Sequence, residues 1–182
     1  MPSPAFSASA SAASTNVSDL KSLYDEMAEP LRRALSRLAF RGADVDDLLQ
    51  EVFVVALRRP DQLLTAQSPK AWLYGVAVRV AAAARTRHRV RSFLGLDSAS
   101  QLADDARGPH ESAEAAETRK QVHHALDQLS GKRREALILF ELEGLSGPEI
   151  SEALGIPLKT VWTRLHHARK DFEQRLTQEG RP

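Results

Sequence analysis

The stretch LEGLSGPEISEALGIPLKTVWTRLHHAR, residues Leu142–Arg169, contains the local signals for two short helices and a tight corner between them. Ser146 and Glu149 form an S-x-x-E capping box, which fixes the start of the first helix. Gly155 stands where a helix most readily ends in a left-handed residue, and Pro157 presets the start of the next helix. The stretch therefore predicts a helix-turn-helix.

The second of these helices has an apolar side and a basic side. Val161, Leu165 and Ala168 recur at spacings of four and three, which predicts one stripe facing the first helix. The other sides carry hydrogen-bond donors and no carboxylate before Asp171, namely Lys159, Thr160, Thr163, Arg164, His166, His167 and Lys170. Such a helix suits the major groove of DNA, while the alternative is a solvated basic face on a packed helical corner.

The composition favours an all-α fold. Of 182 residues, 42% are hydrophobic but only 5% are aromatic, and Ala and Leu recur where a β-rich chain would alternate Val, Ile and Tyr. The net charge of +1 is small, so a nucleic-acid partner has to be argued from local charge. The chain has no cysteine, and we expect a cytoplasmic protein with no membrane insertion.

Three helices are expected in the N-terminal half. Residues 1–17 are rich in Ala and Ser and are expected to form a disordered tail. An apolar pattern then predicts a helix from Ser18 that is kinked or restarted at Pro30. Asp44 is a good N-cap for a second helix, and a third is predicted over Ser68–Arg91, with its first residue as the cap.

Two surfaces of these helices suggest contacts. The outward face of the second helix mixes acids with apolar atoms, at Asp47, Gln50, Glu51 and Val54. That mixture favours a partner helix with arginines and an apolar patch, although acids at a helix start also serve the dipole. The third helix ends in a basic run, at Arg85, Arg87, Arg89 and Arg91. The run suits phosphates, and it equally suits a helix C-terminus.

The remaining segments divide the chain into two domains. Residues 92–117 combine Gly, Ser and Pro with six acids and are expected to form a flexible acidic linker. Helical spacing resumes at Thr118. The sequence therefore predicts an all-α fold of two helical bundle domains, residues 18–91 and 118–176, followed by a tail at residues 177–182.

No catalytic or metal site is expected. The chain lacks the phosphate-binding, dinucleotide-binding, zinc-protease and nucleophile-elbow motifs. The pairs His123/His124 and His166/His167 are neighbours in sequence, so on a helix they point about 100° apart and cannot chelate one metal ion together. We expect no cofactor.

Two stretches resemble a known family. DVDDLLQEVFVVALR followed by SPKAWLYGVA is similar to region 2 of the extracytoplasmic-function (ECF) group of bacterial sigma factors. LSGKRREALILFELEGLSGPEISEALGIPLKTVWTRLHHARK looks like region 4 of the same group. The two stretches occur in the family's order and separation, and together they cover roughly Leu20–Leu176.

The resemblance implies a non-enzymatic subunit that directs core RNA polymerase to promoters and helps to open them. It implies that the outward face of the second helix binds the coiled coil of the polymerase β′ subunit, with the β flap and an anti-sigma factor as further partners. It assigns the melting of the −10 element to Trp72, Arg79, Arg85, Arg87 and Arg89. It assigns recognition of the −35 element to Lys159, Thr160, Thr163, Arg164, His167 and Lys170.

The chain departs from the family pattern at three places, one of which is His167, where Arg is usual. An Asn and an Asp that commonly follow the AWLYGVA motif are absent, and Val78–Ala83 stands there instead. Trp162 stands where Lys is usual. The alternatives are a stand-alone helix-turn-helix regulator, or a sigma-derived interaction protein without promoter-melting activity.

Overall fold

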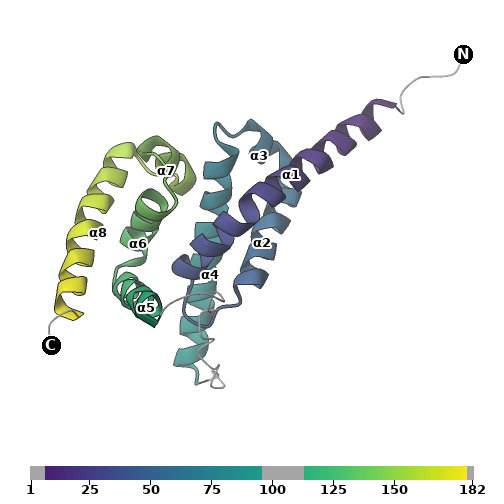
Figure 1. Ribbon diagram of the computed structural model, residues 1–182. Helices are drawn as coiled ribbons and strands as arrows, with labels where there is room; N and C mark the ends of the chain where they lie inside the picture. The colour runs from purple at the N-terminus through teal and green to yellow at the C-terminus, as the bar shows by residue number, and fades with distance from the viewer. Residues whose placement is uncertain (1–6, 96–112, 180–182) are drawn as a thin grey trace, which may run out of the picture.

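The structure, a computed structural model, describes residues 7–95 and 113–179, and its described side chains are those of 21–95 and 117–177. All the regular elements in this part of the chain are helical, which confirms the predicted all-α class. In chain order they are α1 (Ser7–Leu38), α2 (Val45–Arg58), α3 (Pro60–Thr65), α4 (Pro69–Phe93), α5 (Ala113–Asp127), α6 (Gly131–Leu137), the π-helical turn η1 (Ile138–Leu142), α7 (Gly147–Leu154) and α8 (Leu158–Glu179). Figure 1 shows α1 to α4 on one side of the molecule and α5 to α8 on the other.

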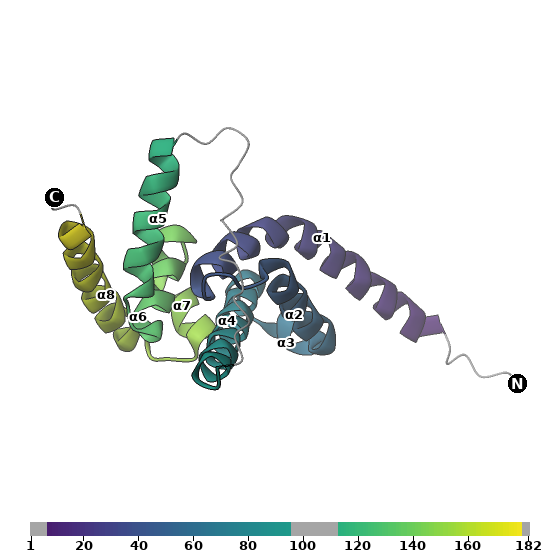
Figure 2. The same ribbon diagram turned by 90° about the horizontal axis from the view of Figure 1, so that it is seen from below.

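Helix α1 is longer than predicted. It begins at Ser7, within the segment that was expected to be disordered, and it continues through Pro30 without a break. Four of the residues 7–13 are Ala, which has the highest helix propensity and favours the extension. Figure 2 shows α1 as a bent helix, and an internal proline is a common cause of a bend.

The starts of α2 and α4 follow the predicted caps. The Asp44 carboxylate accepts hydrogen bonds from the backbone N–H groups of Asp46 and Asp47, each at 3.1 Å. The Ser68 hydroxyl accepts from the Ala71 N–H at 3.1 Å, with Pro69 in the first turn. The short helix α3 between them was not predicted.

The helix-turn-helix forms as the sequence predicts. The Ser146 N–H donates to Glu149 Oε2 at 2.9 Å, and the Glu149 N–H donates to Ser146 Oγ at 3.4 Å, which completes the capping box of α7. Gly155 ends α7 in the left-handed region with φ 62°. The boundaries differ at both ends of this unit, since α5 begins at Ala113, inside the predicted linker, and α8 continues to Glu179, inside the predicted tail.

The two predicted bundles pack against each other, and one cluster of buried residues includes side chains of both. A continuous cluster of buried apolar side chains runs from Met27 in α1 to Ala168 in α8. Helix α4 lies between α1 and α2 on one side and α7 on the other, as both views show. The reason is that the part of α4 between Ala71 and Ala84 carries buried apolar residues around most of its circumference, so it can pack against neighbours on more than one side. The linker residues 96–112 lie outside the described residues.

Polar contacts also join the two units. The Glu143 carboxylate, 4% exposed, accepts from Arg37 at 3.1 Å and from the Tyr74 hydroxyl at 2.9 Å. Arg85 of α4 pairs with Glu135 of α6 at 3.1 Å, with both side chains largely buried. Buried charges are retained only when they are paired, so these contacts specify one arrangement of α4 against the C-terminal unit.

Candidate nucleic-acid and polymerase surfaces

Helix α8 presents its predicted basic side to solvent. Val161, Leu165 and Ala168 are buried against the rest of the unit. On the other sides the side chains of Lys159, Thr163, His166, His167 and Lys170 are exposed, and those of Thr160 and Arg164 are half-buried. None of the nominated recognition residues points into the core, so the whole set is available to a ligand.

The electrostatics of this side favour an anion. Asp171, the first acid of α8, forms an ion pair with Arg133 of α6, which offsets its negative charge. Arg164 lies near Glu135 and acts to lower the pKa of that carboxyl, although burial, the larger effect, raises it. The Thr163 hydroxyl donates to the Lys159 carbonyl at 2.9 Å, so in this arrangement it can only accept a hydrogen bond from a ligand. The donors that a phosphate would meet here are the exposed ammonium groups of Lys159 and Lys170.

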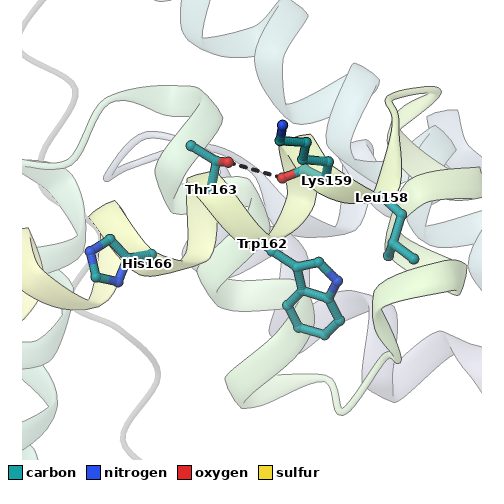
Figure 3. A pocket seen from close by; sticks show the side chains of 5 residues that line it. All are labelled: Leu158, Lys159, Trp162, Thr163 and His166. Carbon is teal, nitrogen blue, oxygen red and sulfur yellow. Dashed lines mark hydrogen bonds between the residues drawn. The ribbon is translucent and has the colours of Figure 1, made fainter.

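One feature of α8 was missed by the sequence prediction. Leu158, Lys159, Trp162, Thr163 and His166 line a shallow groove along the helix, and Figure 3 shows the Trp162 indole at its side. The indole is 46% exposed, although it is the largest apolar group on this helix. The signal in the sequence was a tryptophan on the flank between the apolar stripe and the basic side.

The candidate melting residues on α4 differ in their accessibility. Arg79, Arg87 and Arg89 are exposed, while Trp72 is half-buried against the core. Burial and the neighbouring charge of Arg59 lower the pKa of Arg79, so two cations lie close together there.

Arg85 does not share this accessibility. Its guanidinium is held by Glu135, and in this arrangement it is not free to contact DNA. Arg85 therefore serves the contact between α4 and α6, whereas Arg87 and Arg89 are exposed to a ligand.

The outward face of α2 is arranged as predicted. Asp47, Gln50, Glu51 and Val54 are all exposed, and they form one face of the helix. Leu57, also exposed, extends the apolar part of that face by one turn. The face thus combines carboxylates with apolar atoms at spacings that a partner helix can contact.

The α2 face and the basic run of α4 meet. The Arg87 guanidinium lies 3.3 Å from Glu51 Oε1, in an exposed ion pair. A cleft beside it runs from the start of α2 to the end of α4 and has acids on one wall and arginines on the other. Two surfaces that the sequence treated separately are therefore adjacent, while the α8 surface lies on the other unit, at a distance from both.

Residues 7–95 and 113–179 contain neither a candidate membrane span nor a candidate metal site. No helix there is both long enough and apolar enough to span a membrane. No group of three or more His, Asp or Glu residues comes together in a geometry that would hold a metal ion.

Comparison with known proteins places both units in one family. Residues 23–91 match the family model described as Sigma-70 region 2, and residues 119–172 match the one described as Sigma-70, region 4. The ECF RNA polymerase sigma factor SigL of Mycobacterium tuberculosis is 31% identical over 170 residues, which is 93% of this chain and 95% of that protein. The RNA polymerase sigma factor CnrH of Cupriavidus metallidurans is 29% identical over 167 residues, 88% of this chain and 87% of that protein.

Solved structures share this fold. A structure of CnrH with the cytosolic domain of CnrY has a TM-score of 0.67 at 25% identity and covers 94% of this chain and 96% of that one. The sigma factor RpoE of Bartonella quintana, solved with the anti-sigma factor NepR, has a TM-score of 0.70 at 23% identity. The match covers 90% of this chain and 99% of that one. The chain is thus a helical protein of the sigma-70 class. Within that class it belongs to the ECF sigma factors.

Proposed function

We propose that this protein is a promoter-specificity subunit that binds core RNA polymerase in the cytoplasm, directs it to particular promoters and helps to open them. The observation that carries the proposal is the simultaneous exposure of two different faces on one ECF-type chain. The acidic and apolar face of α2 is free to bind a protein, and the basic side of α8 is free to bind duplex DNA.

The two units divide the work in this proposal. Residues 118–176 read the −35 element as duplex, through Lys159, Thr160, Thr163, Arg164, His167 and Lys170, by contacts to phosphates and base edges. Residues 18–91 hold the −10 element after it opens, through Trp72 and the α4 arginines. Captured unpaired bases offset the free energy of separating the strands. The chemistry of RNA synthesis belongs to the polymerase.

The partners follow from the same surfaces. The α2 face, Asp47, Gln50, Glu51 and Val54, is the proposed contact with the β′ coiled coil, and the second unit is the proposed contact with the β flap. The RpoE and CnrH relatives were solved with NepR and with the cytosolic domain of CnrY, and NepR is an anti-sigma factor. We propose that a comparable protein regulates this chain.

Run-off transcription tests the proposal. Purified core polymerase, the full chain and a pool of promoter fragments should give specific transcripts that core polymerase alone does not give. Tight duplex binding by the chain without polymerase would indicate a stand-alone regulator instead. Polymerase binding without transcripts from any fragment would indicate an interaction protein that does not open promoters.

Two variants should separate the two surfaces. Val54→Asp places a charge on an exposed apolar position, so we expect weaker binding to core polymerase with unchanged thermal stability. Lys159→Ala should leave polymerase binding intact and weaken holoenzyme binding to promoter duplex about equally for all sequences. The slope of log affinity against log salt should become shallower by about 1. Lys120 is an exposed lysine on α5, so Lys120→Ala is the matched control. It should change neither polymerase binding nor promoter binding.

A further inference from the structure

We propose that Trp162 reads the C5-methyl group of a thymine in the −35 element, which adds an apolar contact to the polar ones assigned to α8. The inference rests on the proposed function, because it concerns the same helix in the same groove of DNA. It assigns a role in sequence selection to a residue outside the basic set.

The indole is held in a defined position. A Cβ placed on Gly147 would lie 2.5 Å from Trp162 Cζ2 and 2.9 Å from Cη2, so the ring fills the space that the missing side chain leaves at the start of α7. The Phe140 ring meets the indole edge-on, with centroids 5.8 Å apart. An exposed aromatic group that is fixed from behind loses little conformational entropy on binding, which makes it a good contact residue.

The charges around the groove identify its occupant as DNA. Lys159 and His166 line the groove together with Trp162, and in the view of Figure 3 the Lys159 side chain and the indole point to opposite sides of the helix. The carboxylate of Glu141, next to Phe140 in sequence, is paired with Arg169 at 2.7 Å, and Arg169 also lies over the Phe140 ring. An apolar strip with Lys159 at its border, and no carboxylate among the residues that line it, suits a polyanion with an apolar group on its groove edge.

The thymine methyl is that apolar group. In the major groove each base pair shows a distinct set of donors and acceptors, and thymine alone adds a methyl group. Trp162 and Leu158 offer apolar surface at the side of the groove, whereas Lys159 and Thr163 supply polar contacts one step around the helix. The four together specify a thymine next to bases or phosphates that are read by hydrogen bonds.

The experiment uses holoenzyme reconstituted from core polymerase and the full chain. Promoter duplexes with a randomised −35 element are selected with the wild type, Trp162→Ala and Trp162→Phe, after thermal melts have confirmed that each variant folds. The wild type should enrich one thymine that Trp162→Ala no longer enriches, while preferences at the other positions remain. Trp162→Phe, still apolar, should retain part of the enrichment.

Replacing the selected thymine by deoxyuridine isolates the methyl group. The wild-type holoenzyme should lose about fourfold in affinity at that one position, a value expected for one buried methyl group, and Trp162→Ala should lose nothing further. An unchanged selection profile in Trp162→Ala overturns the inference and leaves the proposed function standing. Weaker assembly of Trp162→Ala with core polymerase, with the DNA preference intact, assigns the groove to a protein partner and also overturns it. A wild type that selects no duplex overturns the proposed function, and the inference with it.

Discussion

At the residue scale, Glu149 illustrates how one side chain serves the fold in two ways. Its carboxylate accepts from both the hydroxyl and the backbone N–H of Ser146, and it also accepts from the Ser68 hydroxyl of the other unit at 3.4 Å. The first two bonds start α7, and the third contributes to the contact between α4 and α7. A local signal in the sequence therefore also takes part in a long-range contact.

The pKa of Glu149 leads to a prediction. Hydrogen bonds from the Ser146 side chain and then from its backbone lower this pKa below 4.5. The folded state then binds fewer protons than the unfolded state, so the ionised carboxylate stabilises the fold above about pH 4.5, and this contribution is lost as pH falls through the lower folded value. Glu149→Gln keeps the capping box but not the charge, and should make the free energy of unfolding less sensitive to pH in that window.

Urea unfolding at a series of pH values measures this effect. At neutral pH, Ser146→Ala should lower the free energy of unfolding by about 1 kcal/mol, because it removes the cap. Ser151 has its hydroxyl bonded to the Ile156 carbonyl outside the box, so Ser151→Ala is a serine control whose pH dependence should match the wild type. Equal pH dependence in Glu149→Gln and the wild type would contradict the prediction.

At the element scale, most helices carried local signals and were predicted, whereas α3 and the π-helical turn η1 were not. Capping residues and apolar spacing within one helix identified α2, α4, α7 and α8, because those signals depend on neighbours in sequence. Helix α3 has only six residues and begins at Pro60, and nothing in PDQLLT requires it to be helical in isolation. The π-helical turn η1 likewise depends on how the chain packs after α6, and its sequence resembles ordinary helix.

Gly155 provides the test at this scale. Its φ of 62° ends α7 and turns the chain into α8, and no side chain blocks the site. Gly155→Ala therefore meets no steric clash with neighbours but forces an L-residue into the left-handed region, and should lower the free energy of unfolding by about 1 kcal/mol. Chemical denaturation measures this. Asn tolerates the left-handed conformation better than Ala, so the free energy of unfolding of Gly155→Asn should lie between those of the wild type and Gly155→Ala. A Gly155→Ala variant as stable as the wild type would refute the role of the turn.

At the scale of the whole molecule, the packing of the two units was not predictable from local patterns. The sequence suggested that residues 18–91 and 118–176 would fold separately, because an acidic Gly- and Pro-containing segment joins them. The contact between α4 and α7 pairs residues far apart in the chain, and its clearest sequence signal was that α4 between Ala71 and Ala84 is apolar around most of its circumference. The candidate surfaces on α2 and α8 were predictable, since each is one side of one helix, but the pairing of Arg85 with Glu135 was not.

Gly75 controls this packing and yields the prediction for the whole molecule. A Cβ at this position would lie 2.4 Å from the Ala153 carbonyl oxygen, a backbone atom that cannot rotate away. Gly75→Ala should raise the helix propensity of α4 by up to about 1 kcal/mol, but overpacking at the contact costs about 1–3 kcal/mol. The clash outweighs the propensity gain at the interface, while each unit keeps its own helices. We expect the units to separate without unfolding.

Small-angle X-ray scattering and amide hydrogen exchange measure the separation. Gly75→Ala should show a larger radius of gyration and faster exchange in α7, with unchanged helix content by circular dichroism. Gly131→Ala is the matched control at the same interface, because its Cβ would meet Arg85 Nη2 at an ordinary 3.6 Å. A Gly75→Ala protein as compact as this control would show that α7 shifts locally to accommodate the methyl group, and that the contact between α4 and α7 does not depend on the glycine.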